Sequence, residues 1–130
     1  MSAPHSSHQP TVLIVEDEEA ARALTARMLL EAGYRVLTAP DGLAALAILA
    51  GLSHPVDVVL TDLRMPRMDG ETLAAYLMER SPTPKIVFMS GFAKTHPTGR
   101  LPGPFLSKPF DCDALLATVS RVLRLSSGSA

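Results

Sequence analysis

The sequence predicts an α/β fold in which five parallel strands form an open, doubly wound sheet with helices on both faces. Short apolar segments rich in β-branched residues alternate along the chain with segments whose apolar residues recur every three or four positions. Several of the apolar segments are continuous, as expected for parallel strands that helices cover on both faces. Strands that alternate with helices in this way are typically joined by right-handed crossovers within one parallel sheet.

Five segments are predicted to be strands. They are Thr11 to Val15, Tyr34 to Thr38, Val56 to Thr61, Lys85 to Met89 and Phe105 to Ser107. The first, third and fourth are continuous apolar runs, which indicates that both of their faces are buried.

Four helices are predicted between and after these strands. Their ranges are Glu18 to Ala32, Gly42 to Leu52, Gly70 to Arg80, and a last helix capped by Asp111. Apolar stripes support three of them: Ala21, Leu24, Met28 and Ala32 in the first, Leu73, Tyr76 and Leu77 in the third, and Leu115, Val119, Val122 and Leu123 in the last. Gly33 is placed to end the first helix, and Asp41 is placed to cap the second.

Composition indicates one compact domain between two tails. The chain has 130 residues, 47% of them hydrophobic, which suits a single domain with a substantial core. Residues 1–10 are rich in Ser, His and Pro, and residues 126–130 read SSGSA, so neither segment offers an apolar cluster to bury. We therefore expect a folded domain over residues 11–125, disordered tails on either side, and no room for an output domain.

Charge and cysteine content exclude several classes of protein. The 12 Lys and Arg residues nearly balance 13 Asp and Glu residues, and the net charge of -1 excludes a strongly basic nucleic-acid surface or polybasic membrane anchor. Cys112 is the single cysteine, which excludes an internal disulfide and fits a reducing compartment. The sequence shows neither a signal peptide nor an apolar segment of the ~20 residues that span a membrane. We therefore expect a cytoplasmic protein that binds neither nucleic acid nor membrane.

Acidic residues follow two of the predicted strands. Glu16 and Asp17 follow the first strand, and Asp62 follows the third. In the flavodoxin-like strand order 2-1-3-4-5 these strands are neighbours, so the three carboxylates converge at the carboxyl edge of the sheet. Converging carboxylates repel one another unless a cation is present, and Mg²⁺ prefers such oxygen ligands. Taken alone, each acid has a simpler interpretation: the run from Glu16 to Glu19 could be an acidic first turn of a helix, and Asp62 could cap a turn. We adopt this interpretation for Glu18 and Glu19.

Two further polar residues follow the fourth and fifth strands, namely Ser90 and Lys108. Taken singly, they are interpreted more simply as a turn residue and a solvated surface charge. At the same sheet edge as the acids, however, a hydroxyl and an ammonium group would bind the oxygens of an anion. The combination predicts a phosphoryl-transfer site in which the Asp62 carboxylate attacks phosphorus.

Four stretches of sequence form a pattern that covers essentially all of residues 11–125. They are VLIVEDEE, VDVVLTDLRMPRMDG, VFMSG and FLSKPF, in this order. As a set they resemble the receiver domains of two-component response regulators. The resemblance implies that Asp62 accepts a phosphoryl group from a histidine kinase or a histidine phosphotransfer protein.

The same resemblance assigns roles to the other residues of the pattern. The metal ligands that it implies are Glu16, Asp17, Asp62 and the backbone carbonyl of Arg64. Ser90 and Phe105 correspond to switch residues, although a core aromatic is the alternative for Phe105, and Lys108 corresponds to the lysine that contacts the phosphoryl group. Glu16 replaces the commoner aspartate, and the family usually has a cis bond between Lys108 and Pro109.

The segment between Ser90 and Lys108 departs from the family pattern. It contains Pro97, Gly99, Pro102, Gly103 and Pro104. These residues prevent a regular helix, whereas receivers place a full fourth helix there. We expect a short turn from Phe92 to His96 and then an irregular loop. Signalling would then use either a remodelled version of the family's usual output surface or the first helix, which docks the phosphodonor in the family.

The main hypothesis is a stand-alone receiver, not an enzyme, in which Mg²⁺-dependent phosphorylation of Asp62 shifts a two-state equilibrium and alters binding to another protein. The enzyme alternative is a Mg²⁺-dependent phosphatase with an aspartyl-phosphate intermediate, which needs an acid two residues after the nucleophile, where this chain has Arg64. A phosphate sink, or a receiver detached from a hybrid kinase system, is the third hypothesis. The lifetime of the phosphoryl group would separate a sink from a switch.

Overall fold

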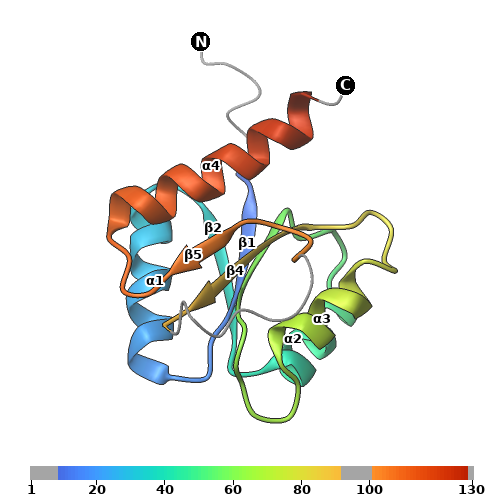
Figure 1. The fold of residues 1–130 in the computed structure, drawn as a ribbon. Coiled ribbons are helices and arrows are strands. Elements are labelled where there is room, and N and C mark those ends of the chain that lie inside the picture. The colour runs from blue at the N-terminus through green and yellow to red at the C-terminus, as the bar shows by residue number, and fades with distance from the viewer. Residues whose placement is uncertain (1–8, 92–100, 129–130) are drawn as a thin grey trace.

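The computed structural model describes residues 9–91 and 101–128, which form a five-stranded parallel sheet (Figure 1). Its strands are β1 (Thr11–Val15), β2 (Arg35–Ala39), β3 (Val58–Asp62), β4 (Lys85–Ser90) and β5 (Phe105–Ser107). The strand order is β2-β1-β3-β4-β5, which confirms the predicted order. Every residue of β1 and β3 is buried, as their continuous apolar sequences indicated.

Helices cover both faces of the sheet (Figure 1). They are α1 (Glu19–Glu31), α2 (Gly42–Ala50), α3 (Gly70–Leu77) and α4 (Cys112–Gly128). Alternate residues of a strand point to opposite faces, so β1 supplies both halves of the core. Leu13 and Val15 belong to the apolar cluster that includes α2 and α3, whereas Val12 and Ile14 belong to the cluster that includes α1 and α4.

The helix ends follow the predicted signals. Asp41 Oδ1 accepts a hydrogen bond from the Ala44 amide at 2.8 Å, and Asp111 Oδ1 accepts one from Ala114 at 2.8 Å, which confirms both caps. Gly33, with a φ of +99°, lies just beyond α1 in the left-handed region that favours glycine.

The apolar stripes predicted for two helices were partly wrong. In α1, Thr25 and Leu29 are buried, whereas Leu24 is 56% exposed. In α3, Leu73 and Leu77 are buried, but Tyr76 is 52% exposed. Successive residues on a helix are roughly 100° apart, so Leu24 and Tyr76 point in a different direction from their buried neighbours Thr25 and Leu77. Hydrophobicity did not identify Thr25 as part of that face.

Backbone contacts of the described residues extend beyond residues 11–125 at both ends. Residues 1–8 of the predicted N-terminal tail lie outside the described residues. Gln9, however, donates a hydrogen bond to the Gly33 carbonyl at 2.9 Å, and the Pro10 carbonyl accepts one from the Arg35 amide at 2.9 Å. At the other end α4 continues to Gly128, past the predicted boundary, because helical backbone bonding needs no apolar side chain. No helix within the described ranges is both long and apolar enough to cross a membrane.

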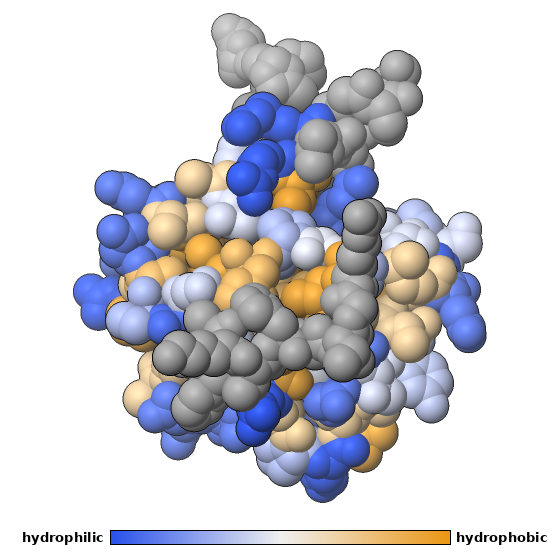
Figure 2. Space-filling model, viewed as in Figure 1, coloured by the Kyte–Doolittle hydropathy of each residue, from blue (hydrophilic) through white to orange (hydrophobic). Residues whose placement is uncertain are grey.

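The chain segment that leads into β5 is fixed to β4 by its backbone. The turn predicted for Phe92 to His96 and the loop that follows it, as far as residue 100, lie outside the described residues. Residues 101–104 contain no helix, in keeping with their glycine and prolines. The Pro104 carbonyl accepts a hydrogen bond from the Phe88 amide at 2.9 Å. Figure 2 shows hydrophobic residues among polar ones on the face of the molecule that carries β5 and α4.

Replacement of Gly103 with alanine is expected to destabilise the fold. A Cβ atom at this position would overlap the Ile86 carbonyl oxygen of β4. We expect Gly103→Ala to lower the free energy of unfolding by about 1–3 kcal/mol, as for other overpacked sites, measured by urea denaturation. Gly51→Ala is the control, because its Cβ would lie 3.8 Å from the nearest atom, the Ile48 carbonyl oxygen. Equal stability of the two variants would show that the loop does not lie this close to β4.

Candidate functional site

Three acids meet at the carboxyl edge of the sheet. Glu16 and Asp17 directly follow β1, and Asp62 is the last residue of β3. The two strands are adjacent, with Val15 opposite Thr61. One carboxylate oxygen from each acid lies within 4.8 Å of the others. The structure therefore brings together the three acids that the sequence placed after separate strands.

The three acids differ in exposure and support. Asp17 is exposed, whereas Glu16 is 3% exposed and Asp62 is 8% exposed. The Glu16 amide donates to the Ala39 carbonyl at 3.1 Å, which ties this residue to the end of β2. The Glu18 amide donates to Glu16 Oε2 at 3.2 Å. Glu16 is thus held rigidly, and Asp17 is open to solvent.

Lys108 joins the two buried carboxylates. Its Nζ donates to Asp62 Oδ2 at 3.0 Å and also to Glu16 Oε1. The Lys108 amide donates to the Ser90 carbonyl at 2.8 Å, so the pairing of β4 with β5 continues one residue beyond β5. Ser90 is itself 3% exposed at the end of β4. The lysine and the serine therefore lie at the same edge as the acids.

The charges of this cluster do not balance. Burial disfavours the Asp62 carboxylate and raises its pKa to about 6, an effect that Lys108 opposes and Glu16 reinforces. Burial also acts to raise the pKa of Glu16, but hydrogen bonds from Lys108 and the Glu18 amide outweigh it, so that pKa is lowered. Burial acts to lower the pKa of Lys108, yet its two acidic partners raise it. The single ammonium group of Lys108 thus cannot neutralise both buried carboxylates when both are ionised, and the remaining negative charge favours binding of a further cation.

The loop from Asp62 to α3 is a tight turn. The Gly70 amide donates to the Leu63 carbonyl at 2.9 Å, and the Met68 amide donates to the Pro66 carbonyl at 2.8 Å. A Cβ atom at Gly70 would overlap the Asp62 carbonyl oxygen, so only glycine fits there. Asp69 caps α3 by accepting a hydrogen bond from the Thr72 amide at 2.8 Å. The chain thus turns directly from β3 into α3.

The remaining predicted residues lie around this cluster. Arg64 belongs to the loop that follows Asp62. Phe105 begins β5 opposite Phe88 and packs, partly buried, against the apolar cluster that includes α2 and α3. It therefore lies at the other end of β5 from Lys108. The Lys108-Pro109 bond is cis, as the family resemblance implied.

Sequence analysis missed two arginines that support the loops of the site. Arg22 Nη1 in α1 donates to the Glu16 carbonyl at 2.9 Å. Arg67 Nε, in the loop after β3, donates to Asp41 Oδ2 at 3.2 Å. Arg22 faces a partner six positions earlier in the chain, and Asp41 precedes Arg67 by 26 positions. Helical periodicity and strand ends, the signals used to find the site, identify neither contact.

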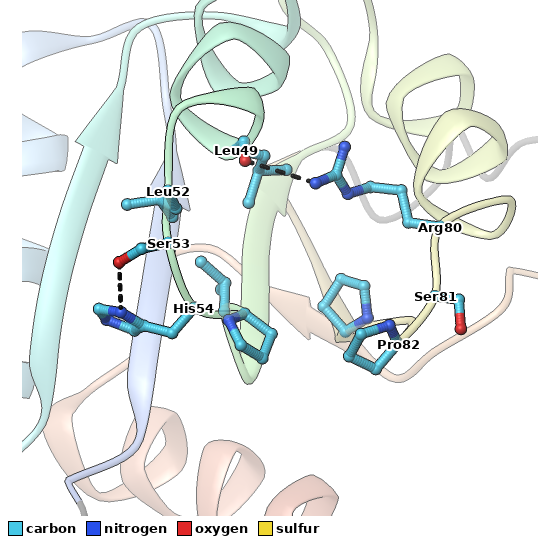
Figure 3. A pocket seen from close by; sticks show the side chains of 10 residues that line it. Leu49, Leu52, Ser53, His54, Arg80, Ser81 and Pro82 are labelled. Carbon is cyan, nitrogen blue, oxygen red and sulfur yellow. Dashed lines mark hydrogen bonds between the residues drawn. The ribbon is translucent and has the colours of Figure 1, made fainter.

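Two cavities lie at opposite edges of the sheet. One has a volume of about 410 Å³ and is mainly apolar; Glu16 and Lys108 line it together with apolar residues that include Leu24, Met28 and Phe110. The other lies at the amino ends of the strands (Figure 3). There Arg80 Nη2 donates to the Leu49 carbonyl at 3.4 Å. No acid lines this second cavity, so it is separate from the candidate site.

Comparisons with known proteins agree with this architecture. The response regulator receiver domain family matches residues 12–120. The response regulator receiver protein CpdR of Brucella abortus is 34% identical over 116 residues, which cover 86% of this chain and 95% of CpdR. The sensor kinase CckA of the same organism is 41% identical over 121 residues, which cover 90% of this chain. The chain spans only 13% of CckA and 12% of the sensor histidine kinase TmoS of Ectopseudomonas mendocina.

Solved structures show the same fold. The chemotaxis protein CheY4 of Vibrio cholerae has a TM-score of 0.79 at 31% identity, with 89% of this chain and 100% of that chain covered. The receiver domain of the hybrid histidine kinase CckA has a TM-score of 0.75 at 35% identity, with 87% of this chain and 98% of that chain covered. With the sheet order, the acidic edge and the family match in agreement, this chain belongs to the response regulator receiver domain family of two-component signalling.

Proposed function

We propose that this receiver domain accepts a phosphoryl group on Asp62 in a Mg²⁺-dependent reaction and thereby alters its binding to another protein. The observation that carries the proposal is the placement of Asp62, which lies at the sheet edge among two further acids with Lys108 Nζ 3.0 Å from its Oδ2. The donor would be a phosphohistidine of a histidine kinase or of a histidine phosphotransfer protein. Similarity to CckA and CpdR supports a place in such a phosphorelay.

The oxygen-rich, negatively charged cluster suits a Mg²⁺ ion. Glu16, Asp17 and Asp62 would hold the ion, together with the backbone carbonyl of Arg64, because Mg²⁺ prefers a few carboxylate oxygens and retains several waters. The bound ion would neutralise charge on the phosphoryl oxygens. The exposed carboxylate of Asp17 would be the most accessible ligand.

The residues of the chain supply the remaining chemistry. A carboxylate oxygen of Asp62 attacks phosphorus, a P–O bond forms, and the P–N bond to the donor imidazole breaks. With a pKa of about 6, Asp62 is mostly ionised at pH 7 and is available as the nucleophile even before a cation binds. Lys108 places its ammonium group beside the accepting oxygen. Ser90, at the end of β4, would donate its hydroxyl hydrogen to a phosphoryl oxygen.

We further propose that Ser90 and Phe105 carry the switch. Both lie on the paired strands β4 and β5, where Ser90 is opposite Ser107 and Phe105 is opposite Phe88. A shift of the Ser90 hydroxyl toward the phosphoryl group would therefore be transmitted through this strand pair to Phe105. The enzyme alternative is disfavoured, because Arg64 occupies the position where a phosphatase of this type needs a second acid.

Replacement of Asp62 with asparagine is expected to abolish phosphorylation. Incubation of the wild type with Mg²⁺ and acetyl phosphate, followed by intact-protein mass spectrometry, should show one phosphoryl group per chain. Asp62→Asn removes the nucleophilic oxygen anion and should show none. Asp113→Asn, which removes an acid in the first turn of α4, is the matched control and should label like the wild type. Equal labelling of Asp62→Asn and the wild type would refute Asp62 as the acceptor.

The raised pKa of Asp62 also predicts a pH-dependent effect on stability. Its pKa of about 6 in the folded protein exceeds the ordinary value of 3.8, so its contribution to stability is full below pH 4 and is lost as the pH rises through 6. Asp62→Asn removes the buried charge. In metal-free buffer we expect this variant to gain about 1 kcal/mol in free energy of unfolding at pH 7.5, and much less at pH 4.

Urea denaturation at both pH values, with EDTA present, measures this difference. Asp113→Asn is again the control and should show no such pH-dependent gain. A gain for Asp62→Asn that is as large at pH 4 as at pH 7.5 would contradict the raised pKa, and so would a loss of stability at pH 7.5.

A further inference from the structure

An ion pair joins the loop that follows Asp62 to the start of α2. Arg67 Nε donates to Asp41 Oδ2 at 3.2 Å, and Arg67 Nη2 donates to the same oxygen. The other oxygen of this carboxylate caps α2 through the Ala44 amide. The Asp41 side chain is 4% exposed, whereas that of Arg67 is 64% exposed. The Arg67 guanidinium is the main cause that lowers the pKa of Asp41, which keeps this buried carboxylate ionised.

The backbone of Arg67 adopts an unusual conformation. Arg67 has a φ of 72°, and it is the one non-glycine residue with a positive φ in the part of the chain that the structure describes. Side chains other than glycine are disfavoured in this region. The chain thus has an arginine, paired with Asp41, at a position where the backbone alone would favour glycine.

The neighbouring residues reinforce the connection. A Cβ atom at Gly42 would lie 2.8 Å from Sδ of Met68, so the start of α2 packs directly against the residue that follows Arg67. Met68 itself is buried. In Figure 1, α2 and α3 lie side by side on one face of the sheet, and the loop enters α3 from β3. The cap of α2, Asp41, thus contacts Arg67, and the first residue of α2, Gly42, packs against Met68.

We propose that Arg67 is a positioning residue of the cation site. Through its contact with Asp41 it holds the loop from Leu63 to Asp69 in the conformation in which the Arg64 carbonyl is a ligand beside Asp62. The inference rests on the proposed Mg²⁺-dependent function. Neither Arg67 nor Asp41 belongs to the group of acids that would hold the ion. Mg²⁺ demands nearly ideal octahedral geometry, so freedom in a ligand-bearing loop weakens its binding. Residues that orient ligands from outside the coordination shell affect metal affinity strongly for this reason.

Two variants separate the ion pair from the other roles of these residues. Arg67→Gly removes the guanidinium while it accepts the positive φ without strain. Asp41→Asn retains a side-chain oxygen to cap α2, since asparagine is an equally good N-cap, but it loses the charge that binds Arg67. Isothermal titration calorimetry with Mg²⁺ alone, at pH 7.5, gives the dissociation constant of each variant and of the double variant.

We expect each single variant to raise the Mg²⁺ dissociation constant about tenfold. The double variant should show no further rise, because both substitutions remove the same interaction. Gly103→Ala is the control for general destabilisation, since its Cβ would overlap the Ile86 carbonyl oxygen near the amino end of β4, and it should leave the dissociation constant unchanged. Urea denaturation confirms that each variant is folded before titration.

The possible outcomes distinguish this inference from the proposed function. If the wild type binds Mg²⁺, Asp17→Asn does not, and both single variants bind like the wild type, the inference is wrong and the proposed function stands. If Gly103→Ala weakens binding as much as Arg67→Gly does, the effect is one of stability and the inference is again wrong. If the wild type binds no Mg²⁺, the proposed function itself is wrong.

Discussion

Two buried carboxylates share the hydrogen bonds of a single lysine, and this arrangement dominates the chemistry of the candidate site. Lys108 contacts both Glu16 and Asp62, and a single ammonium group does not neutralise two carboxylates. Burial, reinforced by Glu16, raises the pKa of Asp62, whereas hydrogen bonds from Lys108 and the Glu18 amide outweigh burial and lower the pKa of Glu16. A site with this excess of negative charge binds a cation readily, and a cation there would also favour the approach of a phosphoryl group. Burial in a compact sheet thus produces the properties that a phosphoacceptor needs.

The parallel topology assembles this site from residues that are distant in sequence. Because all strands point the same way, their carboxyl ends share one edge, where the acids at the ends of β1 and β3 meet the residues at the ends of β4 and β5. The two helical layers bury the strands on both faces and keep that edge rigid. Gly70 lets the chain turn tightly after Asp62, and the contact of Arg67 with Asp41 ties the same turn to α2. The site therefore depends on loops that the core and a few polar contacts support.

The sequence predicted the features that follow from local patterns. Continuous apolar runs identified β1, β3 and β4. The positions of polar residues at strand ends predicted that Glu16, Asp62 and Lys108 would lie together, because topology brings those ends to one edge. Features that depend on packing were not predictable in the same way. The buried face of α1 includes the polar Thr25 and excludes Leu24, so hydrophobicity alone selected the wrong stripe. The Arg67 contact joins two loops across 26 positions, and no periodicity relates them.

The pKa of Asp62 tests the central claim most directly, because it reports how burial, Lys108 and Glu16 together act on this carboxylate. Carbon-13 NMR titration of the Asp62 carboxyl group, with and without Mg²⁺, measures it in the intact chain. The predicted result is a pKa of about 6 in metal-free buffer and a clearly lower pKa with saturating Mg²⁺, since a bound cation stabilises the carboxylate. A pKa near the ordinary value of 3.8 without metal, or one that Mg²⁺ leaves unchanged, would contradict a phosphoacceptor site built on this imbalance.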